Sequence, residues 1–461
     1  MSSTTGFVEN TSQTRKREPF SYHYHIEPPS GDGDRVERFL MAFAAILRHS
    51  NYHFLVDMYA NTSSKCGRCA VSCQVYQASD DPRDVPCYRT NLLLDVYRRY
   101  FTTSGWLRSS FGANGLLTEE KIDEMAELFY RCTACRRCKI ECPLGVDHGL
   151  MTHLGRYILS ESGIAPKGLV VSVREQLEGK TGNTSAIPVP ALLDNLEFLQ
   201  EELEEMKGTQ VPFPVDQEGA EYIFFPAVSD YLMEADTLMG NAAVLYAANS
   251  PWTIGTGYFD GINYGLFYSD WVLERIIQKL VAEAHRLKAR KVLIGECGHA
   301  ARSARQFVPT FAQNGALPVL SCLELTDHLI KDRRLDLDTD AIRERVTYHD
   351  PCNIARSGWI VEQPRRILRS FVRDFVEMQP HGTRNYCCGG GGGLVSLDET
   401  HTFRMEIVGK AKAEQIRSTG ADIVATPCAN CKKQLRELVD YYDLPVQIVG
   451  VHDLVLRAIR L

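Results

Sequence analysis

The 461-residue sequence has no long hydrophobic run. Its longest uninterrupted apolar stretch is the nine-residue segment Phe39–Leu47, whereas a helix that spans a bilayer needs about 20 apolar residues. The basic residues Arg15–Arg17 are not followed by the apolar segment that a secretory signal requires. The sequence therefore predicts neither a membrane-spanning helix nor export, and we expect a cytoplasmic protein in a reducing environment.

Positive charge is also scarce, and no dinucleotide-binding pattern is present. The 51 lysines and arginines are outnumbered by 58 aspartates and glutamates, which gives a net charge of −7. This balance offers no electrostatic reason to expect a nucleic acid as a partner. The sequence also lacks the Gly-x-Gly-x-x-Gly fingerprint of nicotinamide and flavin sites. Electrons handled by this chain must therefore come from another subunit.

Cysteine, in contrast, is abundant, with 15 residues in the chain. In a reducing compartment cysteines bind metal or act in catalysis more often than they form structural disulfides. Most of them fall into three groups, which lie within residues 66–87, 132–142 and 352–431. A chain of this length can hold several domains, so we expect more than one metal site.

The middle group has the spacing of bacterial ferredoxins, Cys132-x2-Cys135-x2-Cys138-x3-Cys142 followed by Pro143. In that motif the first three cysteines bind one [4Fe–4S] cluster and the fourth binds a second cluster. Zinc sites also use Cys-x-x-Cys pairs, but they do not require the third spacing or the Cys-Pro pair. The group therefore predicts iron–sulfur clusters.

The first group, Cys66-x2-Cys69-x3-Cys73, departs from this motif because Ser63 stands where its first cysteine would be. If the fourth cysteine of each group crosses over, one cluster is bound by Cys73, Cys132, Cys135 and Cys138. The other cluster then has Cys66, Cys69 and Cys142 and lacks one ligand. We expect Cys87 to supply it; a [3Fe–4S] cluster or ligation by Ser63 are the alternatives.

We expect a mobile arm at residues 1–34 and a mainly helical ferredoxin-like domain at residues 35–165. A helix from Arg35 to Ala60 is predicted by apolar residues at helical spacing, namely Val36, Phe39, Leu40, Phe43 and Leu47. Its apolar face either packs on its own domain or docks on a partner subunit. Further helices are predicted at residues 90–101 and 117–130, the latter starting near Thr118. Residues 166–219 are predicted to form a linker that contains a helix at 192–206.

The rest of the chain is an internal repeat, with halves at residues 220–330 and 331–461. Each half has four matching parts: an apolar strand and turn (222–227 and 346–352), a Gly-rich segment (255–261 and 387–393), a second strand and turn (291–300 and 422–431), and a final strand and helix (318–330 and 445–459). This alternation predicts two small α/β domains with parallel sheets, and hence a multidomain α+β and α/β protein. Ligands are expected beyond the carboxyl ends of the strands.

The two halves differ in their cysteines. The second half has five at patterned positions: Cys352, Cys387, Cys388, Cys428 and Cys431. The first half keeps only Cys297, with Ala227 opposite Cys352 and Ala300 opposite Cys431. Cys322 is off the pattern, and we expect it in an apolar strand of the core. The sequence predicts that one half binds a cluster and the other does not.

Two features of the second half favour metal binding. Cys428 and Cys431 begin a predicted helix, whose N-terminus favours thiolates. The five glycines Gly389–Gly393 let the backbone approach an inorganic core closely. A phosphate-binding loop would need a following Lys-Ser or Lys-Thr pair, which is absent. A thioredoxin-like dithiol at Cys428 and Cys431 would leave the other three cysteines unexplained.

The five-cysteine pattern resembles the cysteine-rich CCG domain of heterodisulfide reductases. A ferredoxin-like domain ahead of two such domains resembles the HdrD-like proteins, which include the DsrK, TmcB and HmcF groups, and the resemblance covers residues 50–461. It implies a noncubane [4Fe–4S] cluster held by the five cysteines, on which a disulfide is cleaved. The single patterned cysteine of the first half is similar to the DsrK-type arrangement, in which one CCG domain is degenerate.

The resemblance implies an iron–sulfur subunit attached to the inner face of the membrane through a partner, such as a membrane cytochrome b or quinone-reactive subunit, alongside other redox subunits. Two [4Fe–4S] clusters would pass electrons to the noncubane cluster, where a disulfide of a small thiol or a sulfur-carrier protein is reduced or formed. Cys297 and His299 are candidates for the substrate side, or else a buried thiol and a hydrogen-bonded loop histidine. We expect His349 to be structural. The alternative function is electron transfer alone, as in the iron–sulfur subunits of glycolate or glycerol-3-phosphate dehydrogenases.

Overall fold

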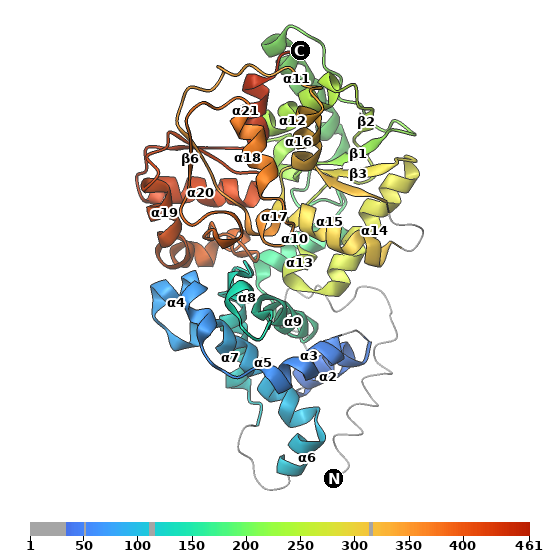
Figure 1. Cartoon of the computed structure of the whole chain (residues 1–461). Coiled ribbons are helices and arrows are strands. Elements are labelled where there is room, and N and C mark those ends of the chain that lie inside the picture. Colours follow the sequence, from blue (N-terminus) through green and yellow to red (C-terminus); the bar gives the residue numbers. More distant parts are fainter. Residues whose placement is uncertain (1–33, 50–51, 110–115, 313–316) are drawn as a thin grey trace. The chain divides into compact units, whose positions relative to one another are not determined.

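The computed structural model describes residues 34–49, 52–109, 116–312 and 317–461. They form two compact units, which are described separately below (Figure 1). The first unit comprises the chain up to Val171 together with Phe267–Trp271 and Gly392–Leu397. The second unit contains the remaining residues. The predicted arm at residues 1–34 lies outside the described residues, apart from Asp34.

The first unit is helical in its described residues. Its helices are α2 (Arg35–His49), α3 (Tyr52–Thr62), α4 (Gln74–Ser79), α5 (Pro86–Tyr100), α6 (Thr103–Ser109), α7 (Glu119–Tyr130), α8 (Arg137–Glu141) and α9 (His148–Glu161), with 3-10 turns η1 (Arg68–Ser72) and η2 (Pro82–Asp84). Pro86 begins α5, a position where its missing N–H costs nothing. The hydroxyl of Thr118 accepts a hydrogen bond from Lys121 N, so α7 begins where the sequence predicted.

Within the helix predicted from Arg35 to Ala60, the structure describes α2 up to His49 and α3 from Tyr52 onward; residues 50 and 51 lie outside the described residues. The apolar face of α2 is buried within its own unit, where Phe39 and Phe43 are fully buried. Phe43 packs edge-on against Phe101, with ring centroids 5.0 Å apart. Of the two interpretations of this face, packing on its own domain is therefore the one that the structure shows.

The second unit contains the sheets of both repeats, each four-stranded and parallel; of the elements of the repeats, η5 (Leu394–Ser396) and parts of α13 (Gly265–Tyr268) and α14 (Asp270–Arg286) belong to the first unit. The first repeat has β1 (Tyr222–Phe225), η3 (Val228–Tyr231), α12 (Ala235–Ala247), β2 (Trp252–Thr253), α13 (Gly265–Tyr268), α14 (Asp270–Arg286), β3 (Lys291–Ile294), α15 (Gly298–Phe311), β4 (Val319–Ser321) and α16 (Cys322–Lys331). Cys322, predicted inside a strand, is instead the first residue of α16, because Ser321 caps that helix. It is buried in the core, as predicted.

The second repeat follows the same order. It has β5 (Val346–Tyr348), α17 (Cys352–Ala355), α18 (Glu362–Arg369), β6 (Phe375–Glu377), η4 (Gly382–Arg384), η5 (Leu394–Ser396), η6 (Asp398–Thr400), the π-helix η7 (Phe403–Val408), α19 (Lys410–Arg417), β7 (Ile423–Ala425), α20 (Ala429–Tyr441), β8 (Gln447–Val449) and α21 (Val451–Ala458). The strands run in the orders β2-β1-β3-β4 and β6-β5-β7-β8, so the two sheets share one topology. The predicted mixed fold of helical and parallel α/β domains is thus confirmed.

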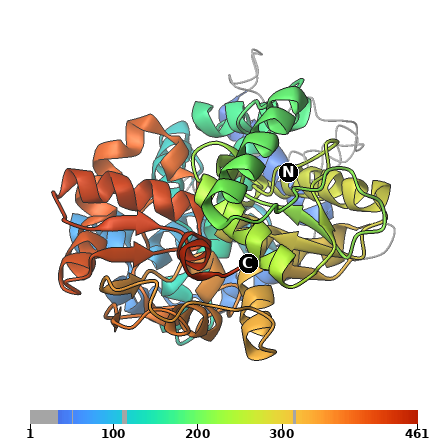
Figure 2. The ribbon, with the colours of Figure 1, turned by 90° about the horizontal axis from the view of Figure 1, so that it is seen from above.

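Two pairs of helices pack against each other between the repeats, which Figure 2 shows from above. Helix α12 packs on α21, and α18 packs on α16. Because α12 and α18 each precede the edge strand of their sheet, and α16 and α21 each end their repeat, these two contacts are equivalent. The repeats therefore pack in the manner of a two-fold dimer within one chain.

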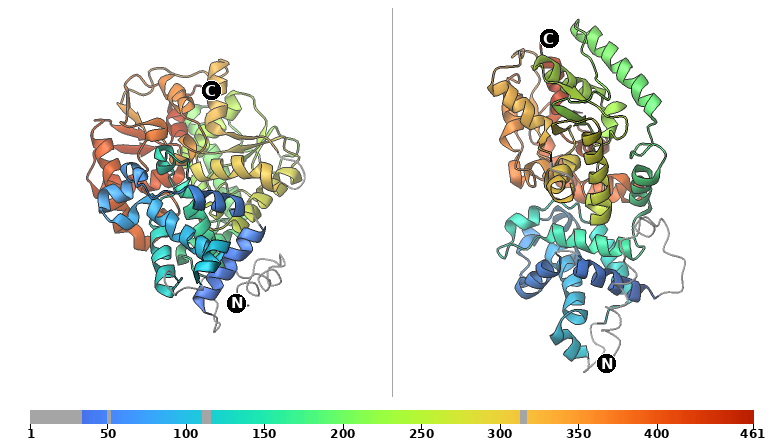
Figure 3. Two further views of the ribbon diagram at one scale, coloured as in Figure 1. Left: turned by 60° about the horizontal axis from the view of Figure 1, so that its bottom comes forward. Right: turned by 90° about the vertical axis from the view of Figure 1, so that its right-hand side faces the viewer.

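Residues 166–219, predicted as a linker with some structure, contain α10 (Lys167–Glu178) and α11 (Val189–Lys207). Helix α11 lies along the outside of the second unit, against α12 and η3 (Figure 3). It buries one stripe of leucines, namely Leu192, Leu196, Leu199 and Leu203. Within the described residues, none of the helices combines the length and the apolar character needed to cross a bilayer.

Candidate iron–sulfur sites

Eight cysteines of the first unit lie around two cavities. Cavity A, with about 270 Å³ of empty space, is lined by Cys66, Cys69, Cys87 and Cys142. Cavity B, with about 390 Å³, is lined by Cys73, Cys132, Cys135 and Cys138. The cysteines are grouped as the crossing pattern predicts, with the last cysteine of each run at the cavity of the other run. Ser63 also lines cavity A, and its hydroxyl accepts a hydrogen bond of 3.2 Å from Asn91.

The backbone around the two cavities has the same unusual shape twice. Lys65 and Gly67 on either side of Cys66, and Ala134 and Arg136 on either side of Cys135, have positive φ angles between 52° and 72°. A non-glycine residue pays about 1 kcal/mol or more for this conformation, so it persists where something else requires it. A loop that wraps thiols around a bulky core supplies such a reason, and the donor set and loop shape fit iron–sulfur clusters.

The thiols at the cavities interact with one another. A hydrogen bond from Cys69 lowers the pKa of Cys87 to about 6, and the same contact raises the pKa of Cys69. Burial raises the pKa of the Cys73 thiol and, together with Cys135 and Cys132, that of Cys138. Buried thiolates this close together need compensating positive charge, which bound iron provides.

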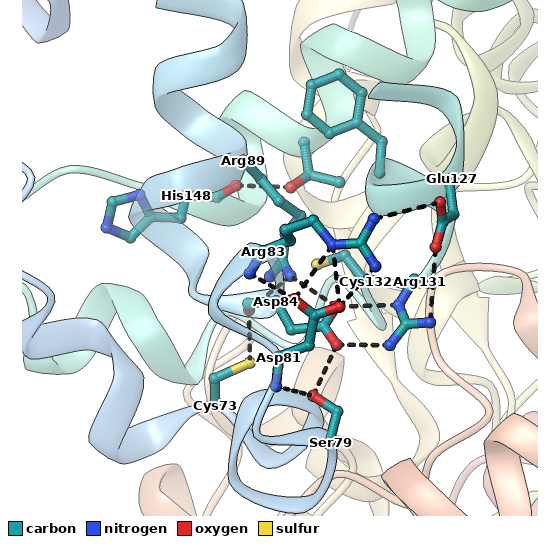
Figure 4. Close-up of polar contacts among 12 residues, drawn as sticks. Cys73, Ser79, Asp81, Arg83, Asp84, Arg89, Glu127, Arg131, Cys132 and His148 are labelled. Atoms are coloured by element: carbon teal, nitrogen blue, oxygen red, sulfur yellow. Dashed lines mark hydrogen bonds and ion pairs between the residues drawn. The ribbon is translucent and has the colours of Figure 1, made fainter. Parts of the chain in front are cut away.

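Polar residues beside cavity B form an ordered network (Figure 4). The carboxylate of Asp84, which is fully buried, accepts hydrogen bonds from Arg131 at 3.0 and 2.5 Å and from Ser79 at 2.7 Å. The side chain of Asp81 accepts from Arg83 N and caps the η2 turn. Cys73 points its thiol at the Asp84 carbonyl, 3.8 Å away. This network fixes the turn between α4 and α5, and so places Cys73 and Cys87.

In the second unit, four of the five patterned cysteines are at most 5% exposed: Cys387, Cys388, Cys428 and Cys431. Cys428 caps α20 and Cys431 lies in its first turn, as predicted. The sulfurs of Cys388 and Cys431 and a ring nitrogen of His349 all lie within 4.8 Å of one another. Cys352 is the first residue of α17 and is partly exposed.

The buried thiols of this site shift one another's pKa through hydrogen bonds. Hydrogen bonds from Cys387, Cys431 and His349 hold the pKa of Cys388 well below its usual range. Hydrogen bonds from Cys431 and from backbone N–H groups also lower the pKa of Cys428. The backbone N–H of Gly389, in the Gly-rich segment, points at Cys387 Sγ at 3.5 Å. The site therefore favours the thiolate form of Cys388 and Cys428, whereas the same two neighbours raise the pKa of Cys431. Thiolates are the form that binds iron.

The first repeat also reaches this site. The backbone N–H of Gly298 donates to the Cys428 sulfur, and a methyl group added at Gly298 would lie 3.4 Å from that sulfur. Cys297 is fully buried, and burial together with Cys428 raises the pKa of its thiol. The Nδ1 atom of His299 lies 3.1 Å from Asn430 Nδ2. In the sequence, Asn430 lies between Cys428 and Cys431. Cys297 and His299 thus lie beside Cys428 and Asn430 as a buried thiol and a hydrogen-bonded histidine, and a role of either residue on the substrate side stays a prediction.

Two residues lie beside the five-cysteine site although the sequence analysis did not place them there. His349, expected to be structural, contacts Cys388, and burial lowers its pKa to about 4. Lys412 was not identified at all; its ammonium donates to Asn385 Oδ1 at 2.8 Å, and burial lowers its pKa to about 7. A lysine within a helical pattern carries no sequence signal for such burial, because most lysines on helices face water.

A small pocket lies between the repeats, close to the site. It is lined by Ala301 and Arg305 of α15 and by Asn353 and Ile354 of α17. Asn353 directly follows Cys352, and its side chain accepts a hydrogen bond of 3.2 Å from Arg302. Cys352 itself is partly exposed.

Comparisons with known proteins agree with these sites. The model of a 4Fe–4S dicluster domain matches residues 64–146, and the model of the cysteine-rich CCG domain matches residues 346–436. An Hdr-like menaquinol oxidoreductase iron–sulfur subunit of Archaeoglobus profundus is 28% identical, over 86% of this chain and 79% of the relative. A homologous subunit of Archaeoglobus fulgidus is 27% identical, over 87% of this chain and 80% of its own length.

A third relative is one of the subunits that make up the dihydromethanophenazine:CoB–CoM heterodisulfide reductase of Methanosarcina acetivorans. It is 23% identical, over 88% of this chain and 95% of its own length. Each of the three alignments covers most of this chain, well beyond either matched domain alone. The predicted resemblance is therefore confirmed: the chain contains a 4Fe–4S dicluster domain and a cysteine-rich CCG domain, and over most of its length it is similar to Hdr-like iron–sulfur subunits and to a heterodisulfide reductase subunit.

Proposed function

We propose that this chain is the iron–sulfur subunit of a membrane-associated redox complex and that it reduces, or forms, a disulfide of a small thiol or a sulfur-carrier protein. The observation that carries the proposal is the five-cysteine site. Its four buried thiols are joined by Cys297 and His299 of the other repeat, and its fifth thiol, Cys352, is partly exposed. A partly exposed ligand on an otherwise buried set of thiols would give a substrate access to a bound cluster.

Each proposed cluster has its own set of ligands. Cavity A would hold a [4Fe–4S] cluster on Cys66, Cys69, Cys87 and Cys142, and cavity B one on Cys73, Cys132, Cys135 and Cys138. The noncubane [4Fe–4S] cluster would be held by Cys352, Cys387, Cys388, Cys428 and Cys431. These clusters supply electrons one at a time, and reduction of a disulfide consumes two electrons and two protons and yields two thiols.

The residues around the five cysteines have defined tasks in this proposal. His349 and the Gly389 N–H hold charge on the sulfurs of Cys388 and Cys387. Gly298, without a side chain, lets α15 approach Cys428 closely. Cys297 and His299 close the site on the side of the first repeat, and the partly exposed Cys352 is where the disulfide would reach the cluster.

Partners and location follow from the relatives named above. Because two of them are subunits of a menaquinol oxidoreductase, we propose a membrane cytochrome b or quinone-reactive subunit as the electron donor or acceptor. This chain would then sit at the inner face of the membrane through that partner, beside other redox subunits.

The test is electron paramagnetic resonance of the oxidised, cluster-loaded protein with candidate thiols added. We expect a thiol to change the signal of the cluster in the CCG domain and to leave the two ferredoxin-type signals unchanged. Iron and sulfide analysis on the same sample checks the metal, because zinc without sulfide would contradict the proposal.

A second candidate function is electron transfer without a substrate. The burial of four of the five cysteines favours it, since a buried cluster is shielded from molecules in solution. This candidate predicts that the cluster of the CCG domain is oxidised and reduced by partner proteins but that its signal does not respond to any thiol. The same titration therefore separates the two functions.

A further inference from the structure

The two cavities of the first unit differ in the cation that faces them. Cavity B is lined by Arg89, which is only 2% exposed. The cations that line cavity A are Lys65 and Arg68, and both are exposed; the Lys65 side chain is 60% exposed. A buried charge acts through a low dielectric, whereas water and salt screen an exposed one. Among the residues that line the two cavities, Arg89 is therefore the buried cation; a second buried cation, Arg156, lies behind cavity B, where it donates to the Cys132 carbonyl at 2.7 Å.

The position of Arg89 follows from helix α5. Cys87 and Arg89 both lie in the first turn of this helix, and they line different cavities, Cys87 cavity A and Arg89 cavity B. The next residue, Thr90, hydrogen-bonds to His148, a lining residue of cavity A, at 2.8 Å. One helix turn thus contributes to both cavities but directs its only cation to one of them.

The charge of Arg89 is only partly matched by its neighbours. Its Nη1 atom donates to the Asp84 carbonyl at 2.8 Å, and the nearest Asp84 carboxylate oxygen is 3.9 Å away. That carboxylate is instead held closely by Arg131 (Figure 4). The buried Nε atom of Arg89 has no hydrogen-bond partner among the described residues. A buried guanidinium with an unsatisfied donor, in the wall of a cavity lined by four thiols, is suited to an anionic occupant.

The second cation that lines cavity B is paired more closely with a carboxylate than Arg89 is. Arg136 also lines the cavity, and its Nε atom lies 3.6 Å from the carboxylate of Asp147. Its side chain is 16% exposed, so solvent reaches it as well. Arg136 therefore adds less net field at the cavity than Arg89 does.

We propose that Arg89 tunes the cluster of cavity B and makes it the more readily reduced of the two ferredoxin-type clusters. The proposal rests on the proposed cluster sites. A [4Fe–4S] cluster on four thiolates is anionic and gains one further negative charge when it is reduced. A fixed, buried positive charge stabilises the reduced form more than the oxidised form, and so raises the reduction potential. Arg89 acts on the cluster only through its electric field and is not a catalytic residue.

The experiment is a potentiometric titration of the full-length, cluster-loaded protein, followed by electron paramagnetic resonance. Cys66→Ser and Cys135→Ser variants first assign each midpoint potential to cavity A or cavity B. The tested variant is Arg89→Gln, which removes the charge. Arg89→Lys restores it, and Arg68→Gln removes an exposed cation at cavity A as the matched control. Asp84→Asn, which keeps the shape of the side chain, removes the nearby negative charge.

We expect Arg89→Gln to lower the midpoint potential of the cavity B cluster and to leave that of cavity A unchanged. Arg89→Lys should return the potential toward the wild-type value, Arg68→Gln should shift neither, and Asp84→Asn should raise the cavity B potential. If Arg89 only supports the Pro82–Asp84 turn, Arg89→Gln and Arg89→Lys should both lower the thermal stability. Neither variant should then shift the potential of the cavity B cluster selectively.

The outcomes also separate this inference from the proposed cluster sites. Unshifted potentials in an Arg89→Gln protein that holds both clusters would overturn the role of Arg89 and leave the cluster sites standing. A wild-type protein without two ferredoxin-type signals would overturn the cluster sites, and the role of Arg89 with them. Should Arg89→Gln not fold, an unshifted cavity B potential in Asp84→Asn would overturn the role of Arg89.

Discussion

The two repeats of the second unit have the same sheet topology, yet their Gly-rich segments contain different chemistry. In the first repeat the backbone N–H of Gly257 donates to the carboxylate of Glu283 at 2.8 Å. In the second repeat the N–H of Gly389 points at the Cys387 sulfur at 3.5 Å. Glycine is needed in both because a Cβ at Gly255 or Gly257 would lie within 2.4 Å of the Glu283 side chain, and Gly389 has φ +108°.

This difference shows how one scaffold supports either a metal site or a structural core. A loop that presents N–H groups stabilises an anion, and the anion can be a carboxylate or a thiolate. The first repeat keeps one of the five patterned cysteines, and its residues Cys297, Gly298 and His299 lie against the cysteines of the second repeat. The predictions below test this division of roles, beginning with the largest expected effect.

The first prediction concerns the repeat that is proposed to hold metal. Cys388→Ala should abolish disulfide reduction and remove the iron of the CCG domain, because Cys388 interacts with Cys387, Cys431 and His349. The signals of the ferredoxin-type clusters should persist. Iron analysis and activity assays measure this. Cys322→Ala is the control, since Cys322 is equally buried but lies in the first repeat; a similar loss of iron there would contradict the division of roles.

The second prediction concerns the contact between the repeats. Lys432 of α20 is fully buried and donates to Thr237 of α12 at 2.7 Å, with Glu234 3.1 Å away. Burial alone would lower its pKa, but Asp230, Asp453, Glu234 and Glu296 raise it, so the lysine stays charged. Lys432→Met removes the buried cation from among these carboxylates, although Glu234 keeps its pair with Arg436, and should lower the free energy of unfolding by about 3–5 kcal/mol.

Urea denaturation followed by circular dichroism measures this loss of stability. Lys433→Met is the control, because the neighbouring lysine is exposed. An equal effect in the two variants would show that the ion network does not hold the repeats together.

The third prediction concerns Asp260 in the Gly-rich segment of the first repeat. Burial raises its pKa from 3.8 to about 6, against hydrogen bonds from Thr184 N and Oγ1. The folded protein therefore binds this proton more tightly than the unfolded chain does. The stability that it contributes is present below pH 3.8 and is lost as the pH rises through about 6, by about 3 kcal/mol in total.

Melting temperatures of wild type and Asp260→Asn, measured from pH 4 to 7, test this. The difference between the two proteins should change across that range in favour of Asp260→Asn as the pH rises. A pH-independent difference would mean that Asp260 is already ionised throughout and that the segment carries a fixed charge.

The smallest effect is expected at the one patterned cysteine of the first repeat. Cys297→Ala should retain the iron of the CCG domain and cost about 1 kcal/mol of stability, because its thiol packs in a fully buried position. Because Cys297 lies close to Cys428, the substitution should also alter the electron paramagnetic resonance signal of the cluster in the CCG domain. Loss of a cluster's worth of iron would instead make Cys297 a ligand and reduce the contrast between the repeats.

Local patterns predicted the strands and most helices well. Strands β1, β3, β5 and β7 lie where short apolar runs end in turns, and α7 starts at its capping threonine. The position of Cys322 was missed because the cap at Ser321 ends the strand one residue earlier than hydrophobicity suggests.

The sequence by itself determined which cysteines belong together, because ligand spacing along a loop is a local property that a metal cluster imposes. Only the tertiary structure decided which charged side chains are buried beside them. Arg89, Lys412 and Lys432 look like ordinary helix-surface residues in the sequence, and each is less than 3% exposed in the fold. Burial depends on what packs over a helix face from elsewhere in the chain, and the field of a charge depends on that burial.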